Sequence, residues 1–400
     1  MDLRSTEPFW LLKNGLLTPY PSLKSDVSCE VLVVGGGITG ALMAYTLTEA
    51  GMNVVVVDKR DVGTGSTAAS TAMLQYEIDV PLHQLIEQVG ERIAVGSYRG
   101  CVEAINVLEK LARITGTDSG FKRKQSLYFA HRTADKARLQ AEYECRQQHG
   151  FRVEWLDRKA LRQRFDLSSA GAILSTDGAE VDAFQLAHGL YRTAVKKGLR
   201  VFDRTEITQT HYTDSGVQLR TATKHRIEAQ QVIYCTGYEA QTQLPEKVVD
   251  LISTFALASE PFEQLPEYFA ETLLWNTQDP YIYLRTTNDN RILIGGYDES
   301  FRDPQRRDAL IPRKEKTLLR AFQKLYPKSA FVPDRSWAGT FGETEDGLPY
   351  IGAHPKFPRS YFALGFGGNG ITFSVTAARV LCDALQGGSP EELTWYRFGR

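Results

Sequence analysis

The 400-residue chain has few cysteines, no excess of charge and no long apolar segment. Its five cysteines, at positions 29, 101, 145, 235 and 382, include no CxxC pair, so we expect neither a disulfide framework nor a metal site built on cysteine. The seven histidines form no metal-spaced pair either, and we predict no metal. The 47 basic and 48 acidic residues leave a net charge of −1, which gives no reason to expect a nucleic acid or an anionic membrane as partner.

A leader peptide and a membrane span are not expected. Residues 1–30 lack a cationic start followed by an apolar run and a cleavage site. Residues 31–47 are the longest apolar stretch, but they fall short of the roughly 20 residues that a span needs, and they carry four glycines. With reduced thiols as the simplest state of the cysteines, we expect a cytoplasmic protein.

A glycine-rich motif lies in that apolar stretch. Residues 30–34 predict a buried strand, residues 35–40 read GGGITG and fit G-x-G-x-x-G, and residues 41–50 have helical spacing. Residues 54–57 predict a second buried strand that ends at Asp58. A lone G-x-G-x-x-G is weak evidence, but a strand, a helix and an acid in this order are typical of a dinucleotide site.

Each part of the motif has a physical role. Gly35 permits the tight turn, Gly37 lets the backbone approach a pyrophosphate, and Gly40 lets the helix pack on the strand. Ile38 and Thr39 begin the helix, whose free N–H groups favour phosphates. A carboxylate at Asp58 accepts hydrogen bonds from ribose hydroxyls and disfavours a 2′-phosphate, so NADP is not expected; Lys59 follows directly.

Residues 63–72, with the sequence GTGSTAASTA, contain only small residues and hydroxyls. A flexible linker has this composition. The segment nevertheless follows directly from the second strand of the nucleotide unit, where it can run along a pyrophosphate and under a flat ring. At this point both FAD and NAD remain open as the cofactor.

The motif, Asp58 and the small-residue run together resemble the FAD-dependent amine and amino-acid oxidoreductases, which include glycine and sarcosine oxidases, D-amino-acid oxidases and dehydrogenases, and γ-glutamylputrescine oxidoreductase. The resemblance extends over nearly the whole chain. It implies that the run wraps the pyrophosphate and the isoalloxazine, which gives as further cofactor contacts Gly65, Ser66, Thr67, Thr71, Ala72 and Met73.

Later segments carry the same resemblance. The stretches TEI, YCTGYEA, WAGTFGETEDGLPYIG and FALGFGGNGITFSVTAARVLCDAL imply FAD contacts at Ile207, Thr236, Gly237, Gly339, Gly368, Gly370, Ile371 and Thr372. Residues 371–386 predict a helix whose N-terminus would face the flavin. The sarcosine oxidase type attaches FAD through a cysteine near residue 340, and none is present there, so we expect noncovalent FAD.

The resemblance implies an α/β fold (α+β overall) with a discontinuous FAD domain. We expect a Rossmann-like FAD-binding domain from residues 1–85, 151–245 and 336–400, and a mainly antiparallel substrate domain from residues 86–150 and 246–335. Residues 281–296 predict a hairpin, with Tyr281, Tyr283 and Arg285 on one face. Helices are expected within 82–114 and 134–148.

The resemblance also implies the chemistry, a hydride transfer from an amine or amino-acid carbon to flavin N5, giving an imine that hydrolyses. O2 or an unknown acceptor would then take the electrons. Amino-acid-oxidising members commonly have an arginine near residues 338–346, and this chain has none there; Glu343 or Glu345 could attract a cationic amine instead. Tyr76, Tyr283 and Arg285 are candidates for the substrate side of the flavin.

Two alternatives to this function are considered. An NAD-linked dehydrogenase shares the fingerprint, although residues 63–72 and the later glycine turn argue against it. A catalytically silent FAD-binding protein is favoured only by the missing arginine.

Overall fold

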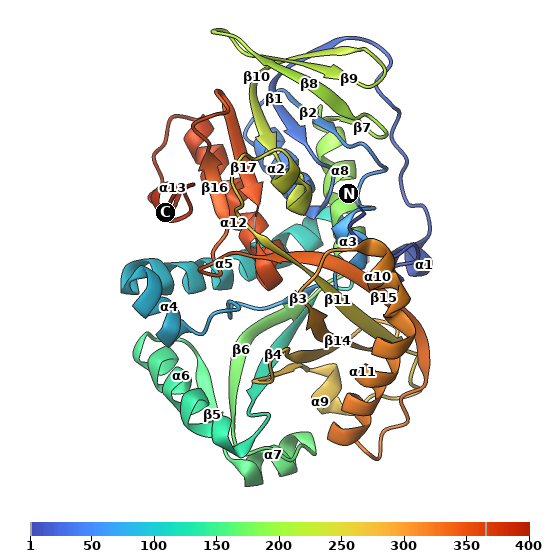
Figure 1. Ribbon diagram of the computed structural model, residues 1–400, viewed down its shortest axis with the longest axis vertical. Helices are drawn as coiled ribbons and strands as arrows, with labels where there is room; N and C mark the ends of the chain where they lie inside the picture. The colour runs from blue at the N-terminus through green and yellow to red at the C-terminus, as the bar shows by residue number, and fades with distance from the viewer. Residues whose placement is uncertain (1, 118, 365) are drawn as a thin grey trace.

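The computed structural model describes residues 2–117, 119–364 and 366–400, and in this part of the chain the strands form two sheets, one above the other in Figure 1. The upper sheet has the order β16-β17-β10-β1-β2-β7, with the β8–β9 hairpin beside β10. Its strands are β1 (Val27–Val34), β2 (Val54–Val57), β7 (Arg200–Phe202), β8 (Ile207–Tyr212), β9 (Val217–Thr221), β10 (Arg226–Tyr234), β16 (Tyr350–Ala353) and β17 (Ser360–Leu364).

The centre of the upper sheet is parallel. Strand β1 pairs in parallel with both β2 and β10, β10 pairs in parallel with β17, and β2 with β7. The last four residues of β1 and all of β2 are buried, as their unbroken valine-rich runs predict. Helix α2 (Ile38–Glu49) follows β1 directly, and the chain turns after it at Gly51, which has φ +84°. The predicted Rossmann-like unit is therefore present.

Long helices cover the upper sheet on the side that faces the rest of the molecule. Helix α2 packs against α8 (Ala183–Val195) and α12 (Gly370–Leu385), and α5 (Glu91–Thr115) packs against both α8 and α12. Together these helices and the strands beneath them enclose a large apolar core. The fold is a mixed α/β fold, as predicted.

The lower sheet is mainly antiparallel. Its order is β15-β11-β14-β13-β12-β4-β6-β3, with β5 beside β6, and the β12–β4 pair is parallel. Its strands are β3 (Met73–Leu74), β4 (Lys122–Phe129), β5 (Val153–Leu156), β6 (Ala172–Glu180), β11 (Asp250–Ser259), β12 (Thr272–Asn276), β13 (Ile282–Thr286), β14 (Ile292–Glu299) and β15 (Pro333–Glu343).

Most predicted elements are found near their predicted places. The β13–β14 hairpin turns at the predicted residues, and the helix predicted at 371–386 is α12. The helix predicted within 82–114 is two helices, because Gly90 between them has φ +87°. The remaining helices are α1 (Phe9–Asn14), α3 (Ser66–Ala69), α4 (Leu82–Val89), α6 (Lys136–Gln148), α7 (Arg158–Phe165), α9 (Glu267–Ala270), α10 (Pro304–Ala309), α11 (Ile311–Leu325) and α13 (Glu392–Trp395), with the 3₁₀ helices η1 (Thr133–Asp135), η2 (Gly237–Thr242) and η3 (Gly367–Asn369).

The sheets divide the chain differently from the predicted domain boundaries in four places. Strand β3 lies in the segment 1–85 that was predicted in the FAD domain, but it pairs with β6 in the lower sheet. Residues 151–182 were predicted in the FAD domain, but β5 and β6 pair in the lower sheet, and so does β15, part of which lies beyond residue 336. Helix α5, predicted in the substrate domain, packs against α8 and α12, which belong to the helices beside the upper sheet. Strand partners far apart in sequence leave no local pattern, so the composition of these segments does not reveal which sheet they join.

Candidate active site

A cavity of about 1000 Å³ lies between the two sheets. The carboxyl ends of three parallel strands of the upper sheet reach it through Val34, Val57 and Tyr234. Side chains from β4, β12, β13 and β15 of the lower sheet line its other side. Ligands of open α/β sheets bind at this edge of the strands, so the cavity is the candidate active site.

The glycine motif is shaped by close backbone contacts. Gly35 has φ +108°, and a Cβ atom there would lie 2.4 Å from the carbonyl oxygen of Cys235. A Cβ atom at Gly40 would lie 1.9 Å from the carbonyl oxygen of Gly35, so Gly40 serves the packing of α2 on β1 and does not line the cavity. Gly37 does line the cavity, and a Cβ atom there would meet only the Thr67 hydroxyl, at 3.0 Å.

Asp58 lies at the end of β2 and lines the cavity. One of its carboxylate oxygens accepts a hydrogen bond from the backbone N–H of Gly36 at 2.6 Å, and the other accepts one from the N–H of Arg60 at 2.7 Å. Burial raises the pKa of the Asp58 carboxyl. Lys59 and Arg60 both form ion pairs with Glu239, at 2.9 and 2.8 Å. This pairing gives the two cations a structural partner at the end of the cavity beside the glycine motif and Asp58, which we call the nucleotide end.

The other predicted cofactor contacts come together around the cavity, although they lie between Ile38 and Ile371 in the sequence. Those that line it are Ile38, Thr39, Gly65, Ser66, Thr67, Thr71, Ala72, Met73, Ile207, Thr236, Gly237, Gly339, Gly368, Gly370 and Ile371. Thr372 lies one residue beyond the lining, and its hydroxyl donates a hydrogen bond to the carbonyl of Asn369 at 2.9 Å.

These residues fit a dinucleotide cofactor. Gly37 lines the cavity, and the N-termini of α2 and α12 both begin there, where their N–H groups favour anionic groups. Ser66 and Thr236 line the cavity with buried hydroxyls that have no hydrogen-bond partner among the described residues. Unpartnered buried hydroxyls are costly, so a polar ligand beside them is expected.

Aromatic side chains form the wall on the lower sheet. Tyr283, Trp275 and Tyr128 occupy paired positions on β13, β12 and β4, and all three line the cavity. The rings of Tyr128 and Trp275 stack, with centroids 3.7 Å apart. Tyr283 lies over Gly295 of the next strand, where a Cβ atom would be 2.3 Å from the phenol ring. Trp275 and Tyr128 were not predicted, because their strands pair only in the folded sheet.

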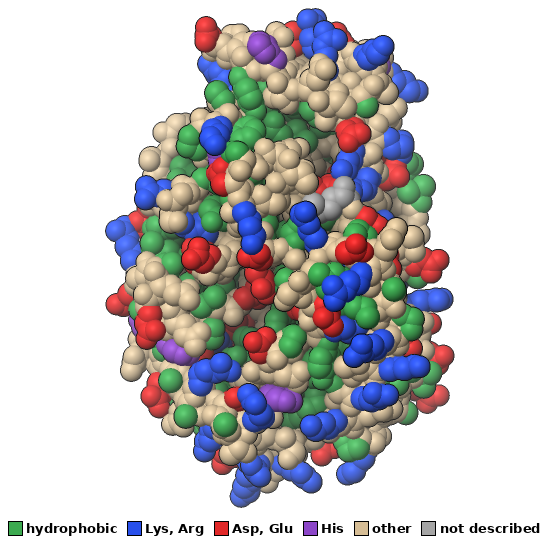
Figure 2. All heavy atoms as spheres, viewed as in Figure 1, with side chains coloured by type: hydrophobic (Ala, Val, Ile, Leu, Met, Phe, Trp, Pro, Cys, Tyr) green, Lys and Arg blue, Asp and Glu red, His purple; other side chains and the backbone are tan. Residues whose placement is uncertain are grey.

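Carboxylates gather at the same end of the cavity. Asp79, Asp279 and Glu343 all line it, and Asp79 accepts a hydrogen bond from the N–H of Gly368 at 2.7 Å. Burial, followed by the charges of Asp79 and Asp279, raises the pKa of the Glu343 carboxyl. Burial, with Glu343 adding, also raises the pKa of the nearby Asp298 to about 7, although Thr254 opposes this shift. On the face shown in Figure 2, acidic side chains gather near the middle, beside a hollow.

Basic side chains are scarce at this end. Among the described residues, the lysines and arginines that line the cavity are Lys59 and Arg60, at the nucleotide end, and Arg138, which is exposed. Arg138 donates a long hydrogen bond to the carbonyl of Thr277, at 3.4 Å. Glu345, the other acid considered for a cationic amine, does not line the cavity.

The structure places Tyr76 away from the cavity. Its side chain is fully buried, its hydroxyl is 3.0 Å from that of Ser175, and its ring stacks on Phe151. Apolar and aromatic packing therefore accounts for this tyrosine, in place of the predicted position beside the flavin.

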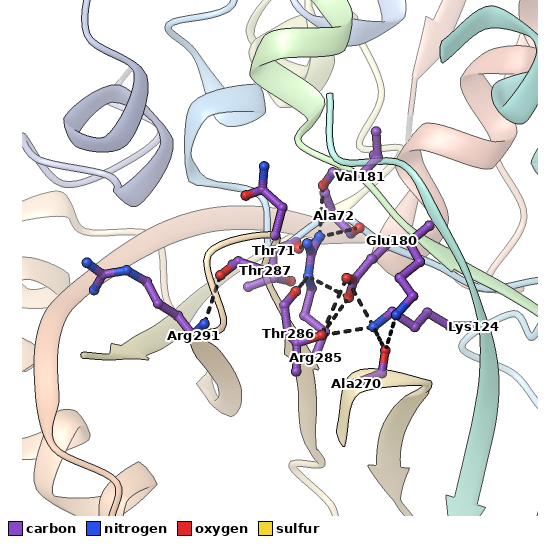
Figure 3. Close-up of polar contacts among 12 residues, drawn as sticks. Thr71, Ala72, Lys124, Glu180, Val181, Ala270, Arg285, Thr286, Thr287 and Arg291 are labelled. Atoms are coloured by element: carbon purple, nitrogen blue, oxygen red, sulfur yellow. Dashed lines mark hydrogen bonds and ion pairs between the residues drawn. The ribbon is translucent and has the colours of Figure 1, made fainter. Parts of the chain in front are cut away.

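Arg285 also lies outside the cavity, although it shares a strand face with Tyr283. Residues 71 and 72 lie between its guanidinium and the cavity, and the guanidinium donates hydrogen bonds to their two carbonyls (Figure 3). Its Nε atom lies 3.5 Å from a carboxylate oxygen of Glu180. Because its guanidinium lies outside the cavity, behind these two residues, Arg285 is not available to a substrate carboxylate.

Comparison with known proteins places these features in one family. The model of the family described as FAD dependent oxidoreductase (DAO) matches residues 30–384. The chain is 27% identical over 397 residues to "Gamma-glutamylputrescine oxidoreductase" of Escherichia coli (strain K12), covering 96% of this chain and 89% of the relative. It is 26% identical over 373 residues to "Glycine oxidase" of Geobacillus kaustophilus (strain HTA426), covering 89% of this chain and 93% of the relative.

Solved structures show the same fold. The crystal structure of glycine oxidase from Geobacillus kaustophilus has a TM-score of 0.76 at 23% identity, over 93% of this chain and 99% of that one. The L-proline dehydrogenase from P.horikoshii also has a TM-score of 0.76, at 18% identity, over 95% and 97% of the two chains. The match to the family model confirms FAD as the cofactor and an oxidoreductase activity, and it decides against the NAD-linked alternative. No helix in the described part of the chain is long and apolar enough to cross a membrane.

Proposed function

The chain belongs to the FAD dependent oxidoreductase family, and on that basis we propose that it oxidises the carbon–nitrogen bond of a cationic amine that has no carboxylate beside the amine. The observation that carries this proposal is the charge of the cavity at its substrate end. Asp79, Asp279 and Glu343 line it together, whereas Arg138 is the basic side chain there among the described residues, so acids outnumber bases at this end. An ammonium group is attracted to such a site, and a carboxylate is repelled.

Phe341 supports the same substrate class. It lines the cavity in the stretch where amino-acid-oxidising members of the resembled family commonly have an arginine. A phenyl ring offers no donor to a carboxylate, so the bidentate grip of an arginine is not available there. The aromatic wall of Tyr128, Trp275 and Tyr283 instead suits the apolar part of an alkylamine and excludes water from it.

FAD, when bound, supplies the two-electron oxidation of the carbon beside the amine. The protein's part is to hold the ammonium group and to take its proton, because the amine must be neutral to be oxidised. The Glu343 carboxylate is suited to accept that proton, since burial and the neighbouring acids raise the pKa of this carboxyl. The imine product then reacts with water to give an aldehyde and an amine or ammonia.

Matched pairs of substrates test the proposal. Butylamine, 1,4-diaminobutane and 1,5-diaminopentane differ from norvaline, ornithine and lysine only by the carboxylate beside the amine. In the pair that reacts best, we expect a higher kcat/KM for the amine than for the amino acid. The rate is measured both by oxygen uptake and by the reduction of an artificial dye. A consistent preference for the amino acids would contradict the proposal.

Glu343 provides a test of the charge itself. Loss of a charged hydrogen-bond partner costs about 1.5–3 kcal/mol, so Glu343→Gln should lower kcat/KM for the amine roughly ten- to hundredfold. Glu345→Gln is the matched control, because this neighbouring acid does not line the cavity. Equal effects of the two substitutions would mean that the acid does not act at the site.

A further inference from the structure

Four consecutive backbone carbonyls in the small-residue run are held by buried side chains. The indole N–H of Trp337 donates a hydrogen bond to the carbonyl of Ala69 at 2.8 Å, and that of Trp10 donates one to the carbonyl of Ser70 at 2.7 Å. The guanidinium of Arg285 donates to the carbonyls of Thr71 and Ala72, at 2.9 and 3.0 Å. We call Trp10, Arg285 and Trp337 the carbonyl clamp.

The three clamp residues come from three separate parts of the chain. Trp10 lies on the short N-terminal helix α1, Arg285 on β13 and Trp337 on β15. All three are buried, with 1–2% of their surface exposed. The clamp therefore ties the N-terminal segment and two strands of the lower sheet to a segment that lines the cofactor end of the cavity.

Arg285 is itself held from several sides. Its guanidinium also donates to the carbonyls of Val181 and Thr286, at 2.8 and 2.7 Å, and it lies 5.6 Å from the ring centre of Trp10. Glu180 pairs with both Arg285 and Lys124, and Lys124 donates in turn to the hydroxyl of Thr286 at 2.9 Å (Figure 3). Such a charged network fixes the guanidinium in one position.

The clamp acts on a strained point of the backbone. Ala72 has φ 52°, a left-handed conformation that a residue with a Cβ atom adopts at a cost of roughly 1–2 kcal/mol. Thr71, Ala72 and Met73 all line the cavity. A carbonyl oxygen that turned towards the cavity would place negative charge against an anionic pyrophosphate, whereas the clamp holds these oxygens against buried donors.

We propose that Trp10, Arg285 and Trp337 are positioning residues that hold residues 69–72 in the conformation that binds FAD. The proposal rests on the cofactor and not on the substrate, so it stands apart from the proposed amine oxidation. It gives the N-terminal segment a role in cofactor binding, although that segment precedes the glycine motif and contributes Leu3 alone to the cavity wall among its first 20 residues that the structure describes.

The dissociation constant of FAD tests this role directly. It is measured on the holoenzyme from the recovery of flavin fluorescence on dilution. Arg285→Lys keeps the charge, but its side chain is one bond shorter and its ammonium does not reach the position of the Nη1 atom that donates to both carbonyls, so it should weaken FAD binding roughly ten- to hundredfold. Trp10→Phe and Trp337→Phe keep the rings and remove one neutral donor each, so each should weaken binding by about fivefold.

Matched controls separate positioning from general destabilisation. Arg291→Lys changes the same residue type on the same hairpin, where the side chain contacts Asp289 and the carbonyl of Ser259. Trp395→Phe changes a tryptophan that packs on Gly96, on helix α5. We expect both controls to retain FAD as the unchanged protein does. Clamp variants with unchanged FAD affinity, or controls that lose FAD as readily, would overturn the proposal.

A second substitution asks whether the left-handed residue is what the clamp holds. Glycine adopts this conformation without a steric penalty, so Ala72→Gly combined with Arg285→Lys should recover part of the lost affinity for FAD. No recovery in the double variant would overturn the clamp as the support of Ala72.

Discussion

The two ends of the cavity are built in different ways. The nucleotide end consists of backbone, glycines and small hydroxyl residues that follow the strands of the upper sheet, and the glycine motif, Asp58 and the small-residue run lie within residues 35–73. The substrate end consists of large side chains from four strands of the lower sheet and of acids from separate loops. A site made of backbone can be recognised from a local motif, whereas a site made of distant side chains exists only after folding.

The largest expected effect is at the nucleotide end. A Cβ atom at Gly37 meets only the Thr67 hydroxyl within the protein, so Gly37→Val should leave the fold intact while its side chain takes the place of the pyrophosphate. We expect the purified variant to lack the visible absorption of FAD, with an unchanged circular dichroism spectrum.

Gly100→Ala provides the control for that variant. Its new Cβ atom would lie 3.9 Å from the hydroxyl of Thr376, an ordinary contact inside helix α5, where alanine is favoured by up to about 1 kcal/mol. This variant should keep FAD. A Gly37→Val protein with full FAD content would show that the cofactor does not approach the backbone at Gly37.

The second effect concerns the substrate end. Phe341→Arg places a bidentate donor in the cavity, so it should lower kcat/KM for the amine and raise it for the matched amino acid. A change of about 1.5–3 kcal/mol in each direction corresponds to roughly ten- to hundredfold. Phe341→Leu is the control, because it removes the ring without adding charge. An arginine variant that keeps the preference for the amine would break the link between the charge of this wall and the substrate.

The same contrast explains what could be predicted from the sequence. Gly35, Gly37 and Asp58 lie within one strand–helix–strand unit, and their roles follow from local geometry. Strand alternation correctly put Tyr283 and Arg285 on one face, but it could not show that residues 71 and 72 cover the guanidinium.

Long-range pairing accounts for the other differences. Trp275 and Tyr128 become neighbours only when β12 pairs with β4, two strands that are more than 140 residues apart in sequence. The predicted domain boundaries differ from the sheets for the same reason, since β6 and β15 read as strands of either sheet. The catalytic candidates were therefore harder to predict than the cofactor contacts.

The third effect is on stability and depends on pH. Asp298 ionises near pH 4 in the unfolded chain but near pH 7 in the folded protein, so between these values the folded state binds more protons and stability falls as the pH rises. Asp298→Asn removes this loss. Allowing for partial solvent contact, we expect the variant to gain on the order of 2 kcal/mol of unfolding free energy over the unchanged protein at pH 8, and little at pH 4.

Denaturant unfolding of both proteins at pH 4, 6 and 8 measures this difference. The gain should grow between pH 4 and 7 and stay constant above pH 7, because both states of the unchanged protein are then ionised. If the difference in unfolding free energy between the two proteins does not vary with pH, then the pKa of Asp298 is not raised in the folded protein. Asp298 would then not belong to the group of acids with raised pKa near the substrate end.

The smallest effect compares two tyrosines, both predicted at the substrate side of the flavin. Tyr76 is buried against Phe151 and its hydroxyl contacts Ser175, whereas Tyr283 lines the cavity. Tyr76→Phe loses one hydrogen bond, so it should lower the unfolding free energy by about 1 kcal/mol and leave kcat and KM unchanged. Tyr283→Phe should change KM for the amine with little effect on stability. If Tyr76→Phe altered the kinetic constants as much as Tyr283→Phe does, the buried tyrosine would act on the substrate through the packed core. Tyr76 would then have to be counted with the residues that determine substrate binding.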